Sequence, residues 1–296
     1  MTTRTRAELA LLATTVIWGG TFTAVKLGME DITPILLIAV RFSVAAVIVG
    51  VIAPRCLAGL PGRQILRGAL LSLFLFAGFI TQNYGLLTTT ASKSAFITGM
   101  MVVVVPVLQV VLERRAPKIG NLVGVMIVVL GLGFLTSPDG AAFNRGDGLT
   151  VVCAVFFGLY IVYLDMVSRE MTTSQVLLLQ TAFTSAYAWI TVLLFESPLW
   201  VFTGRSVLAM VYLTLLATLG TITVQSRYQK DTTPTRAVLI FSIEPVIAAG
   251  IAAVVLGERL GTLGILGGGL IIAGVLVSEF SDQIPWLRRS VGIPPA

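Results

Sequence analysis

Histidine is absent from this chain of 296 residues, and cysteine occurs only twice. Without histidine, the chain lacks the side chain that most often acts as a general base, a metal ligand or a proton relay near neutral pH. Cys56 lies beside an expected loop and Cys153 lies inside an apolar run, so their placement predicts neither a disulfide framework nor a metal site. Carboxylate pairs and metal-binding clusters are not evident either. We therefore expect a protein that is not an enzyme and that holds no metal or other cofactor.

Charged residues are also scarce, at 11% of the chain against 56% hydrophobic residues, and the mean hydropathy is +0.96. Because a soluble domain carries roughly 25% charged residues, most side chains of this protein cannot face water. The net charge of +6 is compatible with nucleic-acid binding, but no soluble segment rich in lysine and arginine is present to provide it. We expect an integral membrane protein whose surroundings are the lipid bilayer, with no nucleic-acid partner.

Ten apolar segments are each long enough to cross a bilayer, for which a helix needs about 20 residues. Proline, glycine and charged residues interrupt these segments, and the connections between them are short. We predict spans at residues 7–28, 33–53, 66–87, 92–112, 119–136, 148–167, 174–195, 206–226, 235–256 and 262–280. The expected fold class is all-α integral membrane with ten transmembrane helices.

Lysine and arginine are distributed unevenly between the two sets of span ends. Most of them lie at the set that includes both termini, and Arg41 alone lies well inside a span. Because cytoplasmic loops carry an excess of lysine and arginine, this bias predicts that both termini are cytoplasmic. The expected location is a cell inner membrane of bacterial type, which the chain crosses many times.

One short phrase occurs twice in the sequence, as TTASK at residues 89–93 and as TTPTR at residues 232–236. Each copy is preceded, seven residues earlier, by a glutamine inside an apolar run, Gln82 in the first case and Gln225 in the second. Duplicated membrane halves are typical of transporters. The repeated phrase therefore indicates both a duplication and a function class.

Further matches extend the duplication along the chain, since the first-half residues Thr33 and Arg41 align with Thr172 and Gln180. With five spans in each half, the second copy enters the membrane from the opposite side, which makes the repeats inverted. The predicted organisation is a first five-helix repeat over residues 1–137, a second, inverted five-helix repeat over 138–280 and a cytoplasmic tail over 281–296.

Two charged residues are expected deep in the membrane, where polar groups usually face a cavity or a partner. Arg41 lies within the second span, and Glu244 lies about halfway along the ninth. Glu244 is either a site for a substrate amine or a proton, or one half of a structural ion bridge with Arg41, and the sequence leaves both options open. Pro245 follows it, and its missing N–H can leave a backbone carbonyl free to bind.

Uncharged polar and aromatic residues complete the predicted cavity. Gln82, Tyr84 and Gln225 can donate and accept hydrogen bonds to a polar substrate, although bonds between helices are the alternative. Trp18, Tyr160 and Tyr163 lie in spans that the duplication makes equivalent, and they suit apolar, aromatic or cationic groups unless they merely pack or face lipid.

Residues outside this cavity have structural interpretations. Lys93 and Arg236 open the fourth and ninth spans, so we expect their side chains to reach lipid headgroups rather than substrate. Small residues in the fifth and tenth spans, among them Gly124 and Gly267, let helix backbones approach closely. We expect this to be packing within a monomer, with a weak dimer as the alternative.

Several of these motifs together resemble the EamA family of the drug/metabolite transporter superfamily. The resemblance covers about residues 7–280. The motifs are Trp18-Gly19-Gly20-Thr21-Phe22, Arg41-Phe42, residues 89–99, Val105-Pro106, Glu244-Pro245 and Gly257-Glu258-Arg259-Leu260.

The resemblance implies two inverted five-helix repeats and a cavity among the first four spans of each, with the fifth and tenth spans peripheral. It also implies a secondary transporter of small metabolites that works by alternating access, with export of amino acids as the expected activity. Arg41, Pro106 and Pro245 would be structural or gating residues. The first half departs from symmetry, because Met101 and Val102 stand where Glu244 and Pro245 stand in the second. The alternatives are a passive channel or facilitator, or an exporter of drugs or nucleotide-type metabolites.

Overall fold

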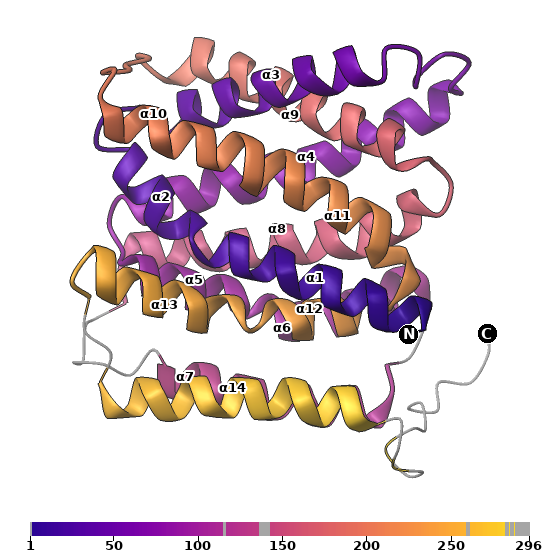
Figure 1. Ribbon diagram of the computed structural model, residues 1–296, viewed down its shortest axis with the longest axis vertical. Coiled ribbons are helices and arrows are strands. Elements are labelled where there is room, and N and C mark those ends of the chain that lie inside the picture. The colour runs from indigo at the N-terminus through magenta and orange to yellow at the C-terminus, as the bar shows by residue number, and fades with distance from the viewer. Residues whose placement is uncertain are drawn as a thin grey trace.

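The computed structural model describes residues 2–114, 117–135, 143–258, 261–281, 284 and 287, and the regular elements within them are helices (Figure 1). Eight helical segments of this described part are long and apolar enough to cross a membrane. They are α1 (Thr3–Gly19) with α2 (Thr21–Gly28), α3 (Pro34–Ile52), α4 (Gly62–Leu86), α5 (Ala91–Gly99) with α6 (Met101–Glu113), α8 (Arg145–Ser168), α9 (Thr173–Phe195), α10 (Gly204–Val211) with η1 (Tyr212–Gly220), α11 (Thr221–Tyr228) and η2 (Gln229–Asp231), and α12 (Pro234–Phe241) with α13 (Glu244–Val255).

Two shorter apolar helices, α7 (Ile119–Leu135) and α14 (Thr262–Phe280), bring the segments to the ten that the sequence predicts. The chain runs back and forth through the bundle, so that α1 begins and α14 ends at the same end, on the right of Figure 1. The expected all-α, ten-helix membrane fold is confirmed. Arg259, Leu260 and most of the predicted tail lie outside the described residues.

Threonine side chains explain why helices begin at the repeated phrase. The Thr90 hydroxyl accepts a hydrogen bond from the Lys93 backbone N–H at 3.1 Å, and the Thr233 hydroxyl accepts one from the Arg236 N–H at 3.3 Å. Each threonine is thus the N-cap of a helix and satisfies one of the free N–H groups at its start. The phrase that occurs twice in the sequence is therefore, in structural terms, the start of a membrane helix.

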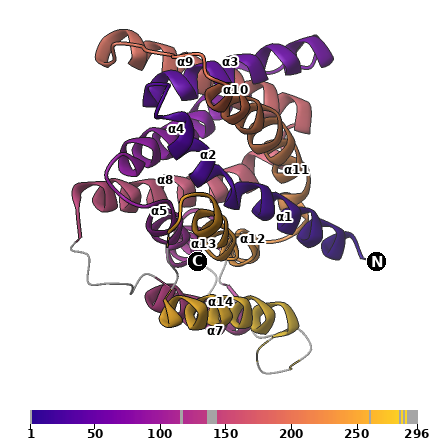
Figure 2. The same ribbon diagram turned by 60° about the vertical axis from the view of Figure 1, so that its left-hand side comes forward.

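Equivalent helices of the two halves pack against each other in pairs. α3 packs on α9 at one extreme of the long axis, and α7 packs on α14 at the other, with α5 and α6 facing α13 and α12 between them (Figures 1 and 2). α4 with α8, and α1 with α11, cross the two halves in the centre of the bundle. Five spans in each half, paired in this way, give the inverted two-repeat arrangement.

Glycines hold the peripheral α7–α14 pair at close range. A Cβ added to Gly124 would lie 2.8 Å from the carbonyl oxygen of Gly274, and one added to Gly131 would lie 2.7 Å from that of Gly267. No side chain fits at such a distance, so these positions require glycine. Tight packing within one chain, as expected from the sequence, is what these glycines provide.

Three of the long spans are broken near their middle. α1 gives way to α2 at Gly20, α5 to α6 at Met100, and α12 to α13 at Ser242 and Ile243. Pro245 lies in the first turn of α13, where its missing N–H removes no helical bond, whereas Pro106 lies inside α6 beyond the break. Broken membrane helices are tolerated where they are buried or line a cavity.

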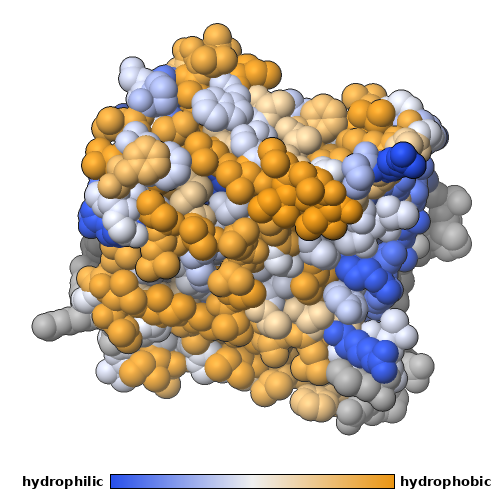
Figure 3. Space-filling view, turned by 45° about the horizontal axis from the view of Figure 1, so that its top comes forward, coloured by the Kyte–Doolittle hydropathy of each residue, from blue (hydrophilic) through white to orange (hydrophobic). Residues whose placement is uncertain are grey.

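Large apolar side chains cover the outside of the bundle. Figure 3 shows a broad hydrophobic band with hydrophilic residues toward its left and right edges, where the helices end. Leu193 and Val254 are 82% and 86% exposed. This surface suits the hydrocarbon of a bilayer, and the chain is a multi-pass membrane protein.

Candidate functional site

A cavity lies inside the bundle, beside the breaks in the three discontinuous spans. It is bordered by both halves of the chain. Its lining residues are Trp18, Thr21, Arg41, Leu75, Phe79, Gln82, Thr98, Met101, Phe157, Tyr160, Ile161, Ala217, Ile222, Gln225, Phe241 and Glu244. The walls are therefore mainly apolar and aromatic, with a few polar groups directed inward, which is the usual make-up of a small-molecule site.

Arg41 is the largest fully buried side chain of the described residues, at 1% exposure. Its Nε donates a hydrogen bond to the Thr218 hydroxyl at 3.0 Å, and its guanidinium lies 4.5 Å from the centre of the Phe79 ring and 5.1 Å from that of Phe42. Ring faces attract cations, so these contacts offset part of the cost of burying the charge. The two terminal NH₂ groups bond to no group in the described part of the chain.

Glu244 is buried at the first residue of α13 and also lines the cavity. A helix N-terminus favours a carboxylate, which helps to hold the charge there. Neither Glu244 nor Arg41 forms an ion pair within the described ranges. The structural ion bridge, one of the two options from the sequence, is therefore not formed, and the guanidinium of Arg41 and the carboxyl group of Glu244 line the cavity separately.

Gln225 is already occupied by hydrogen bonds within the protein. The Tyr160 hydroxyl is 2.8 Å from Gln180 Oε1 and 3.2 Å from Gln225 Oε1, and Gln225 Nε2 donates to Gln229 Oε1 at 2.8 Å. Gln229 in turn donates to the Ile161 carbonyl at 2.7 Å. These bonds join α8, α9, α11 and η2, so the interhelical alternative describes Gln225 well.

Gln82, the repeat equivalent of Gln225, lines the cavity without a hydrogen bond to any other residue that the structure describes. The two glutamines therefore occupy equivalent positions but have different environments. Gln82 keeps an amide available to a ligand, whereas Gln225 does not.

The predicted aromatic residues divide into two groups. Trp18 and Tyr160 line the cavity, and Trp18 donates to the Thr221 hydroxyl at 2.9 Å while its ring meets Phe241 edge-on at 5.1 Å. Tyr84 and Tyr163 are not among the lining residues. Tyr84 is two residues after Gln82, which turns it to the other side of α4, and Tyr163 packs edge-on against Phe74 at 5.8 Å.

Sequence reasoning gave no role to Phe79, Met101 or Phe241 as cavity residues, although all three line it. The signal was weak, because an apolar residue facing a cavity and one facing a neighbouring helix look alike in a sequence. For Met101 the sequence offers one further sign of a cavity position, since it aligns with Glu244.

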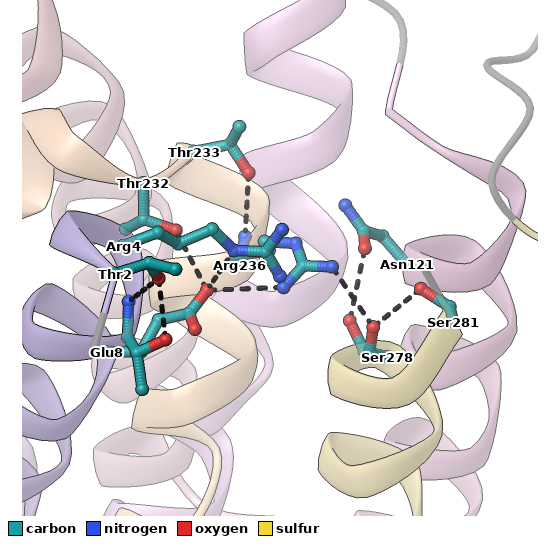
Figure 4. A network of polar contacts seen from close by, with 10 residues as sticks. Thr2, Arg4, Glu8, Asn121, Thr232, Thr233, Arg236, Ser278 and Ser281 are labelled. Carbon is teal, nitrogen blue, oxygen red and sulfur yellow. Dashed lines mark hydrogen bonds and ion pairs between the residues drawn. The ribbon is translucent and has the colours of Figure 1, made fainter. Parts of the chain in front are cut away.

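Lys93 and Arg236 do not reach outward to headgroups, and that expectation was wrong. Arg236 Nη1 lies 3.2 Å from Glu8 Oε1, and its Nη2 donates to the Ser278 carbonyl at 3.3 Å (Figure 4). Lys93 Nζ lies 2.6 Å from Asp147 Oδ2. Each acid is buried and would be costly to leave without a partner, so both basic side chains turn inward to pair with it.

These two ion pairs are themselves equivalent. The alignment that pairs Arg41 with Gln180 also pairs Glu8 with Asp147. The two acids therefore occupy equivalent positions in the repeats, as Lys93 and Arg236 do. Even the accompanying threonines match, since Thr232 lies 3.4 Å from Glu8 Oε1 and Thr89 donates to Asp147 Oδ1 at 2.7 Å.

Ten membrane segments in two equivalent halves, with a cavity between broken helices, are typical of membrane transporters. The chain belongs to the EamA-like transporter family, whose model matches residues 5–137 and again residues 144–280. The separate match in each half agrees with the duplication.

Curated relatives cover most of the chain. An uncharacterized transporter of Archaeoglobus fulgidus is 29% identical, over 93% of this chain and 86% of the relative. A second uncharacterized transporter of the same organism is 26% identical over 92% and 97%, and Protein PagO of Salmonella typhimurium is 22% identical over 95% of each chain. A crystal structure of a protein with 18% identity matches with a TM-score of 0.78, over 95% of this chain and 98% of that one, and shows the shared fold.

Proposed function

We propose that this chain is a secondary transporter that exports amino acids from the cytoplasm by alternating access. The observation that carries the proposal is that a guanidinium and a carboxyl group line one cavity without bonding to each other. The Arg41 guanidinium suits the carboxylate of a free amino acid, and the Glu244 carboxylate suits its ammonium group. Gln82 adds an amide that can bond to either group, and Trp18, Phe79 and Phe241 form an apolar surface for the side chain.

Two other substrate classes fit this cavity less well. A nucleotide-type metabolite carries several negative charges, for which Arg41 alone is too few and beside which Glu244 is repulsive. A lipophilic cationic drug would satisfy Glu244 and the aromatic rings but leave the buried Arg41 without an anion. The zwitterion is the class that compensates both charges.

A passive channel is the competing type of transport. Channels of this size generally need a symmetric oligomer or a ring of charged groups, and the described cavity lies within one chain and carries one charge of each sign. A carrier does not change its substrate chemically, so the transported compound should be recovered unaltered.

The test is uptake of labelled amino acids by the purified protein in proteoliposomes. We expect saturable uptake that is accelerated when the vesicles are preloaded with the same unlabelled amino acid. Matched analogues probe the charges: an amine that lacks the carboxylate and an acid that lacks the amino group should each compete about tenfold less well, since a lost bond to a buried charge is worth about 1.5–3 kcal/mol. Strictly linear flux would contradict a carrier, and equal competition by the analogues would contradict recognition of a zwitterion.

A further inference from the structure

The two halves of the chain are equivalent in sequence but differ in their hydrogen bonds on the two sides of the cavity. Gln180, Gln225 and Ser226 lie toward the end of the bundle where α1 begins, and they are joined, since Gln180 Nε2 donates to the Ser226 hydroxyl at 3.2 Å and Tyr160 bridges the two glutamines. This joined set ties α8 and α9 to α11.

The equivalent residues toward the opposite end are not joined. Arg41 is the counterpart of Gln180, Gln82 that of Gln225, and Asn83 that of Ser226. Arg41 holds Thr218 through Nε, and Gln82 bonds to none of the described residues. The same three positions are thus bonded to one another on one side of the cavity and not on the other, where Asn83 bonds instead to the Pro34 carbonyl.

Asn83 supplies the observation that points to a missing partner. Its side chain is fully buried, and Nδ2 donates to the Pro34 carbonyl at 3.0 Å, but Oδ1 has no hydrogen-bond partner in the described part of the chain. A buried acceptor without a donor costs about 1–3 kcal/mol, so it is normally satisfied in some state of the protein. On the neighbouring α3, Arg41 has two terminal NH₂ groups that donate to nothing in the same described residues.

We propose that Arg41 donates to Asn83 Oδ1 and to Gln82 when the transporter closes this end of the cavity, as Gln180 bonds to Ser226 at the other end. In the present structure the bonds among Gln180, Gln225 and Ser226 are formed and those among Arg41, Gln82 and Asn83 are not, which corresponds in this scheme to the state that is open toward Arg41. Arg41 then has two alternating partners, the substrate carboxylate in the open state and the α4 amides in the closed state. This role of Arg41 as a gating residue depends on the alternating access of the proposed function.

The test measures opening directly, without substrate. Thr21 lines the cavity and belongs to neither set, so Thr21→Cys in a Cys56→Ser, Cys153→Ser background reports access for a water-soluble maleimide. Two variants at one position form a matched pair, because Asn83→Ala and Asn83→Asp both remove the bond to Pro34 but differ in the acceptor offered to Arg41.

We expect Asn83→Asp to slow labelling of the Thr21 cysteine by about tenfold, since a carboxylate favours the closed contact, and Asn83→Ala to leave labelling as fast or faster. Adding Arg41→Gln to Asn83→Asp should restore the labelling rate. Ser226→Ala, which weakens the closed contact at the other end, should slow labelling at Thr21. A labelling rate that changes in the same direction in both Asn83 variants, or in neither, would overturn the proposed role of Arg41 in gating. If the labelling results are as expected but amino acids are not taken up, only the proposed substrate class would be overturned.

Discussion

Buried charge is the dominant feature at the scale of single residues. An arginine or a glutamate inside a membrane bundle is expensive, and proteins retain such groups where function needs them. Arg41 and Glu244 face one cavity, yet neither compensates the other. Each therefore depends on a ligand or on a change of conformation for its partner, which makes them the most informative positions to alter.

Glu244→Gln should separate recognition of the two substrate charges. The amide keeps the shape of the side chain but cannot balance an ammonium group, so we expect amino acid uptake to fall by at least about tenfold. Inhibition by a carboxylate analogue without an amino group should be retained, because Arg41 is unchanged. The measurement is competition in proteoliposomes, and equal loss of both ligands would count against an ammonium site at Glu244.

Gln82→Ala and Gln225→Ala should differ, despite the equivalence of the two positions. Gln225→Ala leaves the buried Gln229 Oε1 without its donor, although Tyr160 keeps its bond to Gln180, so we expect a loss of about 1–3 kcal/mol of stability and a lower melting temperature in detergent. Gln82→Ala breaks no bond within the described protein and should weaken substrate binding with little change in melting. Similar melting of the two variants would contradict this division.

At the scale of helices, two acids from the second half bond to helix ends of the first half. The Glu258 carboxylate, from the loop after α13, accepts hydrogen bonds from the backbone N–H groups of Ala91 and Ser92 at 3.0 and 3.1 Å and one from the Ser92 hydroxyl. Glu196, after α9, does the same for Ile35 and Leu36 at the start of α3. Each acid caps a helix that belongs to the other half.

Glu258→Ala should therefore reduce stability through a helix that is far away in the sequence. Loss of a side-chain cap costs about 1 kcal/mol, and Glu258→Gln should cost less because the amide oxygen still accepts. Thermal unfolding in detergent measures both changes. Glu30→Ala is the control, since Glu30 forms an exposed pair with Arg205 that is worth little. An equal effect of the control would show that Glu258 is not a cap.

The sequence predicts where the helices lie better than it predicts where they break and which residues face the cavity. Apolar runs bounded by proline and glycine locate all ten segments to within a few residues, because bilayer thickness fixes their length. Local residues explain the breaks only in part: Gly99 precedes the break at Met100 and Pro245 follows the break at Ile243, yet Pro106 lies inside a continuous α6. Arg41, Gln82 and Glu244 were identifiable as polar groups at depth, whereas the orientation of Tyr84 and Tyr163 depends on helix rotation that spacing alone leaves open.

At the scale of the whole molecule, sidedness follows from charge. The excess of lysine and arginine at the ends that include both termini supports our proposal that these ends are cytoplasmic and that the membrane is the inner one. Cys56 tests it with a native residue, since it lies partly exposed in the loop between α3 and α4 and Cys153 is buried. An impermeant maleimide should label Cys56 in inverted vesicles but not in intact cells, and the reverse result would invert the topology.

The paired acids and bases at the two ends of the bundle have a consequence for how the two halves are held together. Glu8 and Lys93 belong to the first half, and their partners Arg236 and Asp147 belong to the second. If the halves were separate chains, both ion pairs would be contacts between subunits, and the buried Asp147 carboxylate would lose Lys93, whereas Glu8 would keep Arg4 of its own half. The two ion pairs therefore join the halves at both ends of the bundle, in addition to the segment that connects them along the chain.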